Sequence, residues 1–264
     1  MKRLVLFSAL VPTLALAGNL TVKGSDTMVV LTQRLAEEFM KKNPAAKLQV
    51  TGGGSGTGIA ALINGTTDIA TSSRPMKDEE KGKLKAQPVE IPVAKDGVTF
   101  FVNEKNPVRS LTAEQLKGIY TGDITNWKDV GGPNAPIVVY SRENNSGTYV
   151  FVKEHLLKNE DYLAAAQTLP GTAAVVNAVA KEKNGIGFGG AAYAKGVQAL
   201  KVKVGAEEIS GDEASIRSGK YPLSRPLFFY LREAPKGDAK AFVDWCLSPD
   251  GQKLVAEVGY FSIK

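Results

Sequence analysis

The chain has 264 residues, of which 43% are hydrophobic and 23% charged, as in a folded globular protein rather than a disordered or fibrous one. This length allows one large domain or two of ordinary size. The net charge of +6 is mild and spread along the chain, which favours anionic partners and argues against nucleic-acid binding.

The first 17 residues have the pattern of a secretory signal peptide. Lys2 and Arg3 provide the positive start, an apolar run extends from Leu4 to Leu14, and Ala15-Leu16-Ala17 is a small-residue cleavage site. The run is shorter than the roughly 20 residues that span a membrane, so we expect cleavage and no membrane insertion. Because no cysteine follows to carry a lipid, we expect a free periplasmic protein. Cleavage removes two cations and no acids, which lowers the net charge from +6 to +4.

Strands and helices alternate along the remaining chain. Strand patterns occupy residues 20–22, 48–50, 68–70, 89–93, 98–102, 137–139, 186–188 and 226–231. Helical patterns occupy residues 28–43, 59–64, 77–85, 112–120, 148–157 and 172–181, and two more lie near residues 242 and 254. The third helix is expected to have Pro75 in its first turn. The alternation predicts an α/β fold.

Two long β-rich stretches, 89–102 and 226–231, divide this pattern into two α/β units. The last two helices lack enough strands to form a domain, so we expect them to pack on the first unit. The sequence therefore predicts two lobes, residues 18–95 with 226–264 and residues 96–225, joined by two crossings. A ligand would lie between the lobes, and hinge closure is the motion that this layout permits.

Clusters of Ser, Thr and Gly stand where predicted strands lead into helices. There are four: Gly24-Ser25-Asp26-Thr27, Gly54-Ser55-Gly56-Thr57-Gly58, Thr71-Ser72-Ser73-Arg74, and Arg142 with Ser146-Gly147-Thr148. A helix N-terminus exposes unpaired N–H groups and the positive end of the helix dipole, so it attracts anions. Four such clusters, two with an arginine, predict a site for a small oxyanion.

The segment around Arg142 is the most specific of the four. Arg142 ends a predicted strand, so its guanidinium can project over the sheet edge where ligands bind in such folds. Ser146 is a natural N-cap, and Thr148 lies in the first helical turn. Arginine holds tetrahedral oxyanions with two parallel hydrogen bonds. A capped helix beside a surface arginine is the simpler alternative.

Other motifs favour neither catalysis nor nucleotide binding. The glycine loop at residues 52–58 has Ile59 where a P-loop needs lysine, and Thr57 where a nucleophile elbow needs its second glycine. Gly185-Ile186-Gly187-Phe188-Gly189-Gly190 matches a dinucleotide fingerprint by letter, but reads as a strand itself. We interpret the glycine loop at residues 52–58 as a flexible loop whose backbone can approach a ligand closely.

The chain has one histidine and one cysteine, and neither points to catalysis or metal binding. His155 is expected on a helix surface about two turns beyond Ser146, too far for a triad with it. Cys246 lies in an apolar helical pattern and is expected to be buried and inert. One histidine and one cysteine cannot form the usual zinc site. We expect no cofactor, no metal and no catalytic residues.

Together these segments resemble the phosphate-binding proteins of bacterial phosphate ABC transporters. The matching pieces are residues 24–28, 53–56, 68–74, Arg142 with 146–148, and the middle segment 119–127. The resemblance extends from about Leu20 to the C-terminus. It implies a two-lobed periplasmic-binding-protein fold with two crossover strands, similar to type II, which closes on inorganic phosphate and delivers it to membrane permease subunits. A monomer is usual for such receptors.

The resemblance also implies the ligand contacts. They would fall on Ser25, Asp26, Thr27, Ser55, Ser73, Arg142, Ser146, Gly147 and Thr148. Long family members carry an acid at the end of the third loop, which accepts the proton of hydrogen phosphate, but this chain has Ser73 followed by Arg74. An acceptor-only carboxylate favours phosphate over sulfate. We expect Asp26 to replace this acid, with a helix cap as its alternative role, and Arg74 to offset Asp26 or to contact the anion.

Three alternative functions stay open at this point. One is a receptor for sulfate, molybdate or tungstate, against which Asp26 argues. Another is a secreted phosphatase or esterase using Ser55 or Ser146, which lacks a base and a metal site. The third is an adhesin or sensor that shares the fold and binds phosphate, but whose partner is not a permease.

Overall fold

The computed structural model describes residues 19–263, so the expected signal peptide lies outside the described residues. Eight strands of the main mixed sheet lie in the order β2-β1-β3-β12-β4-β8-β6-β7, and β9 pairs with β4 beside them. They are β1 (Asn19–Gly24), β2 (Lys47–Thr51), β3 (Ile69–Ser72), β4 (Val89–Val102), β6 (Val138–Arg142), β7 (Gln167–Leu169), β8 (Gly185–Gly190), β9 (Gln198–Ala199) and β12 (Ser224–Leu231). A small second sheet has the order β11-β10-β5. It contains β5 (Ser110–Thr112), β10 (Lys201–Val204) and β11 (Glu207–Ile209).

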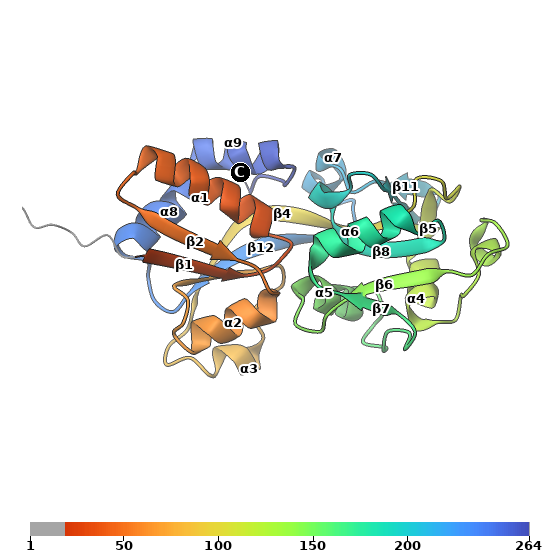
Figure 1. Ribbon diagram of the computed structural model, residues 1–264, viewed down its shortest axis with the longest axis horizontal. Coiled ribbons are helices and arrows are strands. Elements are labelled where there is room, and N and C mark those ends of the chain that lie inside the picture. Colours follow the sequence, from red (N-terminus) through yellow and green to blue (C-terminus); the bar gives the residue numbers. More distant parts are fainter. Residues whose placement is uncertain (1–18, 264) are drawn as a thin grey trace, which may run out of the picture.

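Helices cover these sheets in two groups, which Figure 1 shows as two halves side by side. The α-helices are α1 (Val29–Lys42), α2 (Ser55–Ile63), α3 (Asp78–Lys81), α4 (Ala113–Thr121), α5 (Gly147–His155), α6 (Gly171–Lys181), α7 (Glu213–Arg217), α8 (Gly237–Leu247) and α9 (Pro249–Val258). Two short 3-10 helices are η1 (Trp127–Val130) and η2 (Ala191–Tyr193). We call the half with β1, β2, β3, α1, α8 and α9 lobe 1, and the half with β6, β7, β8, α4 and α6 lobe 2.

The strands β4 and β12 connect the two lobes. The first part of β4 pairs antiparallel with β12 from Val89 to Gly97, and its second part pairs with β8 from Val98 to Val102. On its other side, β12 pairs with β3 in lobe 1. The chain thus passes between the lobes twice (Figure 1), which confirms the two-lobed α/β fold with two crossings. The lobe boundaries at residues 95 and 226 stay a prediction.

Each lobe has a hydrophobic core of its own. In lobe 1, Phe242 of α8 packs edge-on against Phe39 of α1, with 5.5 Å between ring centroids. The C-terminal helices α8 and α9 contact α1, as expected. In lobe 2, the ring centroids of Phe100 and Tyr120 lie 5.4 Å apart, and Trp127 is fully buried in the same cluster. Because apolar burial supplies most folding free energy, separate cores let each lobe hold its shape when the other moves.

The third helix differs from the sequence prediction. A helix was expected over residues 77–85 with Pro75 in its first turn, but α3 extends only from Asp78 to Lys81. Lys77 is its N-cap, and the Glu80 side chain accepts a hydrogen bond from the Lys77 N–H. The chain leaves the helix at Gly82, a residue that weakens helices through its backbone freedom. The third cluster is therefore not a helix N-terminus.

Two other sequence expectations hold in the structure. Cys246 is fully buried, and burial raises the pKa of its thiol well above its ordinary value, so the thiol is inert. The glycine-rich segment 185–190 is the buried strand β8. In the described part of the chain, no helix is long and apolar enough to cross a membrane.

Candidate functional site

The strand ends of both lobes bring the predicted loops together between the lobes. Ser25, Asp26 and Thr27 follow β1, and Ser55 is the first residue of α2. Arg142 is the last residue of β6. Ser146 caps α5, its Oγ accepting a hydrogen bond from the Tyr149 N–H at 3.3 Å. Three of the four clusters thus lie where a strand or loop leads into a helix of eight or more residues.

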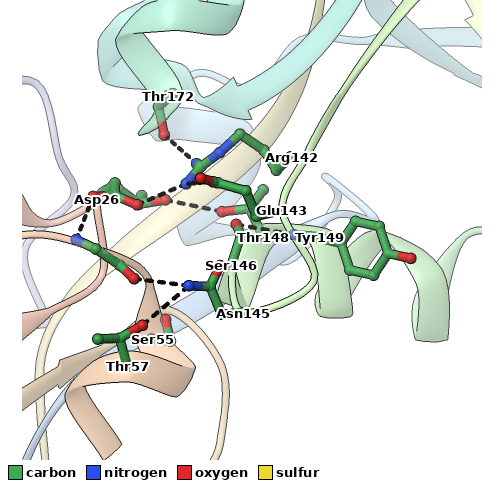
Figure 2. Close-up of polar contacts among 12 residues, drawn as sticks. Asp26, Ser55, Thr57, Arg142, Glu143, Asn145, Ser146, Thr148, Tyr149 and Thr172 are labelled. Carbon is green, nitrogen blue, oxygen red and sulfur yellow. Dashed lines mark hydrogen bonds and ion pairs between the residues drawn. The ribbon is translucent and has the colours of Figure 1, made fainter. Parts of the chain in front are cut away.

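The glycine loop has a backbone that glycine favours. Gly53 and Gly54 have φ values of 109° and 91°, which L-residues with a side chain rarely adopt. The loop also contacts lobe 2. Asn145 accepts a hydrogen bond from Gly56 N–H through its carbonyl, at 2.9 Å. Its side-chain amide donates to Gly53 O at 3.1 Å and to Thr57 Oγ1 at 3.0 Å (Figure 2).

Ser55, Ser73 and Gly147 meet at one point between the lobes. Ser55 Oγ accepts a hydrogen bond from Ser73 N–H at 3.0 Å and lies 3.3 Å from Ser73 Oγ. A Cβ atom at position 147 would overlap Ser55 Oγ and come within 2.7 Å of Ser73 Oγ. A side chain at position 147 would therefore force the two serine hydroxyls to move, because the start of α5 lies directly against them.

Thr27 and Thr148 form a second contact between the lobes. Their Oγ1 atoms lie 2.9 Å apart, and both residues are buried. Two tyrosine hydroxyls hold the backbone of the Thr27 loop in place. Tyr193 donates a hydrogen bond to Asp26 O at 2.8 Å, and Tyr260 donates one to Thr27 O. Burial raises the pKa of Tyr193 to about 12, so this phenol stays a protonated donor.

Arg142 holds the centre of the site. Its Nη1 donates to Thr172 Oγ1 at 3.0 Å, and its Nη2 donates to Asp26 Oδ2 at 2.7 Å. Figure 2 shows the guanidinium between Thr172 and Asp26. Only 1% of the Arg142 side chain is exposed, against 16% for Asp26. Asp26 and Arg142 come from different lobes, so this ion pair joins the two lobes.

Asp26 is engaged through both carboxylate oxygens. Besides the bond to Arg142, its Oδ1 accepts a hydrogen bond from Gly53 N–H at 2.7 Å. The helix-cap alternative for Asp26 is wrong, because the N-cap of α1 is Met28 and no side chain caps this helix. Asp26 instead ties the first loop to the glycine loop and to Arg142.

Several buried donors at the site have no hydrogen-bond partner within residues 19–263. They are the Ser25 hydroxyl, Arg142 Nε and Arg225 Nη1. An unpaired buried polar group costs about 1–3 kcal/mol, so such groups mark a place for a ligand or solvent. Hydroxyls, N–H groups and a guanidinium can all donate hydrogen bonds to an oxyanion.

Arg74 lies apart from these groups. Its Nη2 donates to Glu80 Oε1 at 2.6 Å, and its Nη1 donates to Glu80 Oε2 at 2.8 Å and to Pro75 O at 2.9 Å. Arg142, and not Arg74, therefore pairs with Asp26, while the alternative that Arg74 contacts the anion stays a prediction. Ser73 faces Ser55, while the side chain of Arg74 turns toward α3 and pairs with Glu80.

Four polar residues of this region were not predicted from the sequence. Thr172 at the start of α6 holds Arg142, and Asn145 bridges the lobes. Asp96 and Arg225 form a buried ion pair at 2.9 Å on the crossing strands. Arg225 gave a partial signal as the charged residue of the mostly apolar strand β12, whereas Asp96 shares β4 with Glu90 and Lys95 and did not stand out.

The predicted His155 position holds. The residue is exposed, and its ring stacks on Phe151 with 4.2 Å between centroids. Ser146 Oγ is engaged by a backbone N–H instead. Across residues 19–263, no group of three or more His, Cys, Asp or Glu side chains is arranged to hold a metal ion.

Comparisons with known proteins agree with this fold. Residues 12–250 match the PBP superfamily domain. The phosphate-binding protein PstS of Pseudomonas aeruginosa is 33% identical, over 94% of this chain and 84% of that protein. PstS of Staphylococcus haemolyticus is 36% identical, over 93% and 81%.

Solved structures also show similarity to phosphate transport receptors. A putative phosphate ABC transporter substrate-binding protein from Clostridium perfringens, solved with bound phosphate, has a TM-score of 0.88 and 32% identity, covering 94% of this chain and 100% of that one. An ABC-type phosphate transport receptor from Vibrio cholerae has a TM-score of 0.75 and 31% identity, covering 92% and 99%. The chain therefore belongs to the PBP superfamily and, within it, to the family of the phosphate-binding proteins PstS.

Proposed function

We propose that this protein binds inorganic phosphate between its two lobes and supplies it to an ABC-type import permease. The observation that carries the proposal is the convergence of hydrogen-bond donors from both lobes around the buried Arg142 guanidinium. The proposed ligand set is Ser25, Asp26, Thr27, Ser55, Ser73, Arg142, Ser146, Gly147 and Thr148. Arg74 is not included, because both of its Nη atoms bond to the carboxylate of Glu80 on the side of α3, whereas Arg142 joins the loops of the two lobes.

The chemistry of these groups suits a small tetrahedral anion. Arg142 supplies a charge-assisted donor, and the N-termini of α2 and α5 supply backbone N–H groups and the positive ends of two helix dipoles. The buried Ser25 hydroxyl adds a donor with no partner among the described residues. In a site closed to water, such hydrogen bonds are stronger than in solution.

Asp26 is the group that we assign to the proton of hydrogen phosphate. Its Oδ2 lies 2.7 Å from Arg142 Nη2, and each carboxylate oxygen has two lone pairs, so the bonds to Arg142 and Gly53 leave acceptor capacity. A fully ionised anion such as sulfate has no proton to donate and would be repelled. This assignment favours phosphate over a receptor for sulfate or molybdate.

A binding function without catalysis accounts for the site. The hydroxyl of Ser55 is paired with Ser73, and that of Ser146 caps α5, so neither has a general base beside it. The relatives reported above are phosphate-binding proteins. We extend the proposal to a monomeric periplasmic protein, released by signal cleavage, whose closed form the permease subunits recognise. An adhesin or sensor of the same fold would share the ligand but not this partner.

Calorimetric titration of the phosphate-stripped mature protein tests the proposal. We expect one phosphate per chain and no heat from sulfate at neutral pH. Equal binding of both anions would make the protein a general oxyanion receptor, and binding of neither would contradict the proposal. Turnover of a chromogenic phosphate ester would instead support a phosphatase.

A further inference from the structure

Asp96 and Arg225 occupy the point where the crossing strands separate. They are direct neighbours in the antiparallel register of β4 and β12. From Val98 onward, β4 pairs with β8 of lobe 2. The pair therefore lies at the boundary between the lobes, where a hinge motion would act on the backbone.

This crossing-strand pair is almost completely buried. The exposed fractions are 1% for the Asp96 side chain and 2% for that of Arg225, and Arg225 Nη2 and Nε lie 2.9 Å and 3.3 Å from Asp96 Oδ2. Burial raises the pKa of Asp96 and lowers the pKa of Arg225, and in each case the charge of the partner opposes the shift. Arg225 also lies over the Phe151 ring of α5, 5.2 Å from its centroid.

A hydrogen bond extends from this pair into the phosphate site. Arg225 Nη2 donates to Thr148 Oγ1 at 2.9 Å, and Thr148 Oγ1 lies 2.9 Å from Thr27 Oγ1. The chain of contacts thus links both crossing strands, lobe 2 and lobe 1 in turn.

The direction of these bonds has a chemical consequence. Arginine can only donate, so Thr148 Oγ1 must accept from Arg225 and cannot direct its own proton there. Each threonine hydroxyl has one proton, and the bond between the two hydroxyls uses one of them. The remaining proton of the Thr27–Thr148 pair is left to be donated to an oxygen of a bound anion.

We propose that Arg225, anchored by Asp96, is a positioning residue that leaves the one free hydroxyl proton of the Thr27–Thr148 pair directed at the bound anion, and that it connects anion binding to the crossing strands. This inference rests on the proposed phosphate function. Lysine at position 225 would keep the charge, but it lacks the rigid fork that reaches Asp96 and Thr148 together. We therefore expect Arg225→Lys to weaken phosphate binding about tenfold, the loss typical of one charge-assisted hydrogen bond.

A double-mutant cycle with Thr148→Val distinguishes positioning from direct contact. Phosphate affinity is measured by calorimetry for wild type, Arg225→Lys, Thr148→Val and the double variant. We expect the Arg225 substitution to have little further effect once the Thr148 hydroxyl is gone. Losses that multiply would overturn the proposal, because Arg225 would then act on the anion without Thr148. Unchanged affinity in Arg225→Lys alone would also overturn it.

Controls separate this result from misfolding and from failure of the proposed function. Arg34→Lys, in an exposed ion pair on α1, is the matched substitution and should leave affinity unchanged. If Arg225→Lys does not fold, Asp96→Asn should still weaken phosphate binding severalfold in a Thr148-dependent way, and additive losses would again contradict the proposal. Wild-type protein that binds no phosphate would contradict both proposals, whereas normal wild-type binding with unaffected variants would contradict this one only.

Discussion

Two arginine–aspartate pairs flank the proposed phosphate site, and they differ in where their partners lie. In the cleft pair, Asp26 belongs to a loop of lobe 1 and Arg142 to a strand of lobe 2, with 2.7 Å between Oδ2 and Nη2. In the crossing-strand pair, Asp96 and Arg225 are neighbours in strand register. Separation of the lobes would break the first pair and leave the second intact.

This difference assigns the two pairs different physical roles. Asp26 is 16% exposed, and Glu143 Oε2 lies 3.7 Å from Arg142 Nη2 as a further acidic neighbour, so the cleft pair has partial access to water and a reserve partner. Asp96 and Arg225 are almost fully buried, so each depends on the other for charge compensation. We expect the first pair to control ligand binding and the second to control stability as well.

Substitution of Arg142 should have the largest effect on binding. Arg142→Ala removes the charged donor at the centre of the site, and hydrogen bonds to charged groups contribute about 1.5–3 kcal/mol each. We expect phosphate affinity to fall at least about 100-fold, measured by calorimetry. Arg34→Ala removes the same charge from an exposed helix face and should change affinity little. A loss smaller than about tenfold in Arg142→Ala would show that the anion lies elsewhere.

Asp96→Asn should produce the largest loss of stability. Removing one partner of a buried ion pair leaves an uncompensated charge and costs about 3–5 kcal/mol. We expect urea unfolding without phosphate to show a loss near the lower limit, since asparagine keeps one acceptor oxygen. Asp26→Asn should cost about 1 kcal/mol in the same assay, as for a partly exposed pair. Equal losses would remove the distinction between the two pairs.

Asp26→Asn should instead change selectivity. An amide can donate to sulfate, whereas the carboxylate repels it, so we expect the ratio of phosphate to sulfate affinity to fall about tenfold or more. Competition between the two anions at neutral pH measures this ratio. If selectivity is unchanged, the proton acceptor is another group, such as a backbone carbonyl.

A third ion pair, Arg74–Glu80, lies within lobe 1. We expect its substitution to have the smallest effect on stability and binding, so it is a reference for the other two pairs. Burial alone would raise the pKa of Glu80, but hydrogen bonds from Arg74 and the Lys77 N–H outweigh it, and the pKa is lowered from 4.5. The stability from this ionised carboxylate is present above pH 4.5 and is lost as the pH falls through the lowered folded-state pKa.

Glu80→Gln tests this reference pair. We expect it to lower the free energy of unfolding by about 1 kcal/mol at neutral pH and to make unfolding less sensitive to acid below about pH 4.5. Urea unfolding across this range measures the difference, and phosphate affinity at neutral pH should be unchanged. A weakened affinity would return Arg74 to the ligand set.

Local patterns predicted much of this molecule. The periodicity around Leu31, Leu35 and Phe39 predicted α1, and its end at Asn43 agrees with the structure. The cap at Ser146 was predictable because an N-cap depends only on the next three residues. The length of the third helix was not predicted. The Glu80 side chain bonds to Arg74 at the helix start, and the helix ends at Gly82.

By itself, the sequence determined the alternation of strands and helices, the two crossings and the loops on which the site lies, because these depend on side-chain periodicity and on helix starts. Only the tertiary structure decided which charges meet. Asp26 and Arg142 are 116 residues apart, and Asp96 and Arg225 are 129 apart. No local pattern encodes such pairings, since they arise when strand register and lobe contact bring distant residues together.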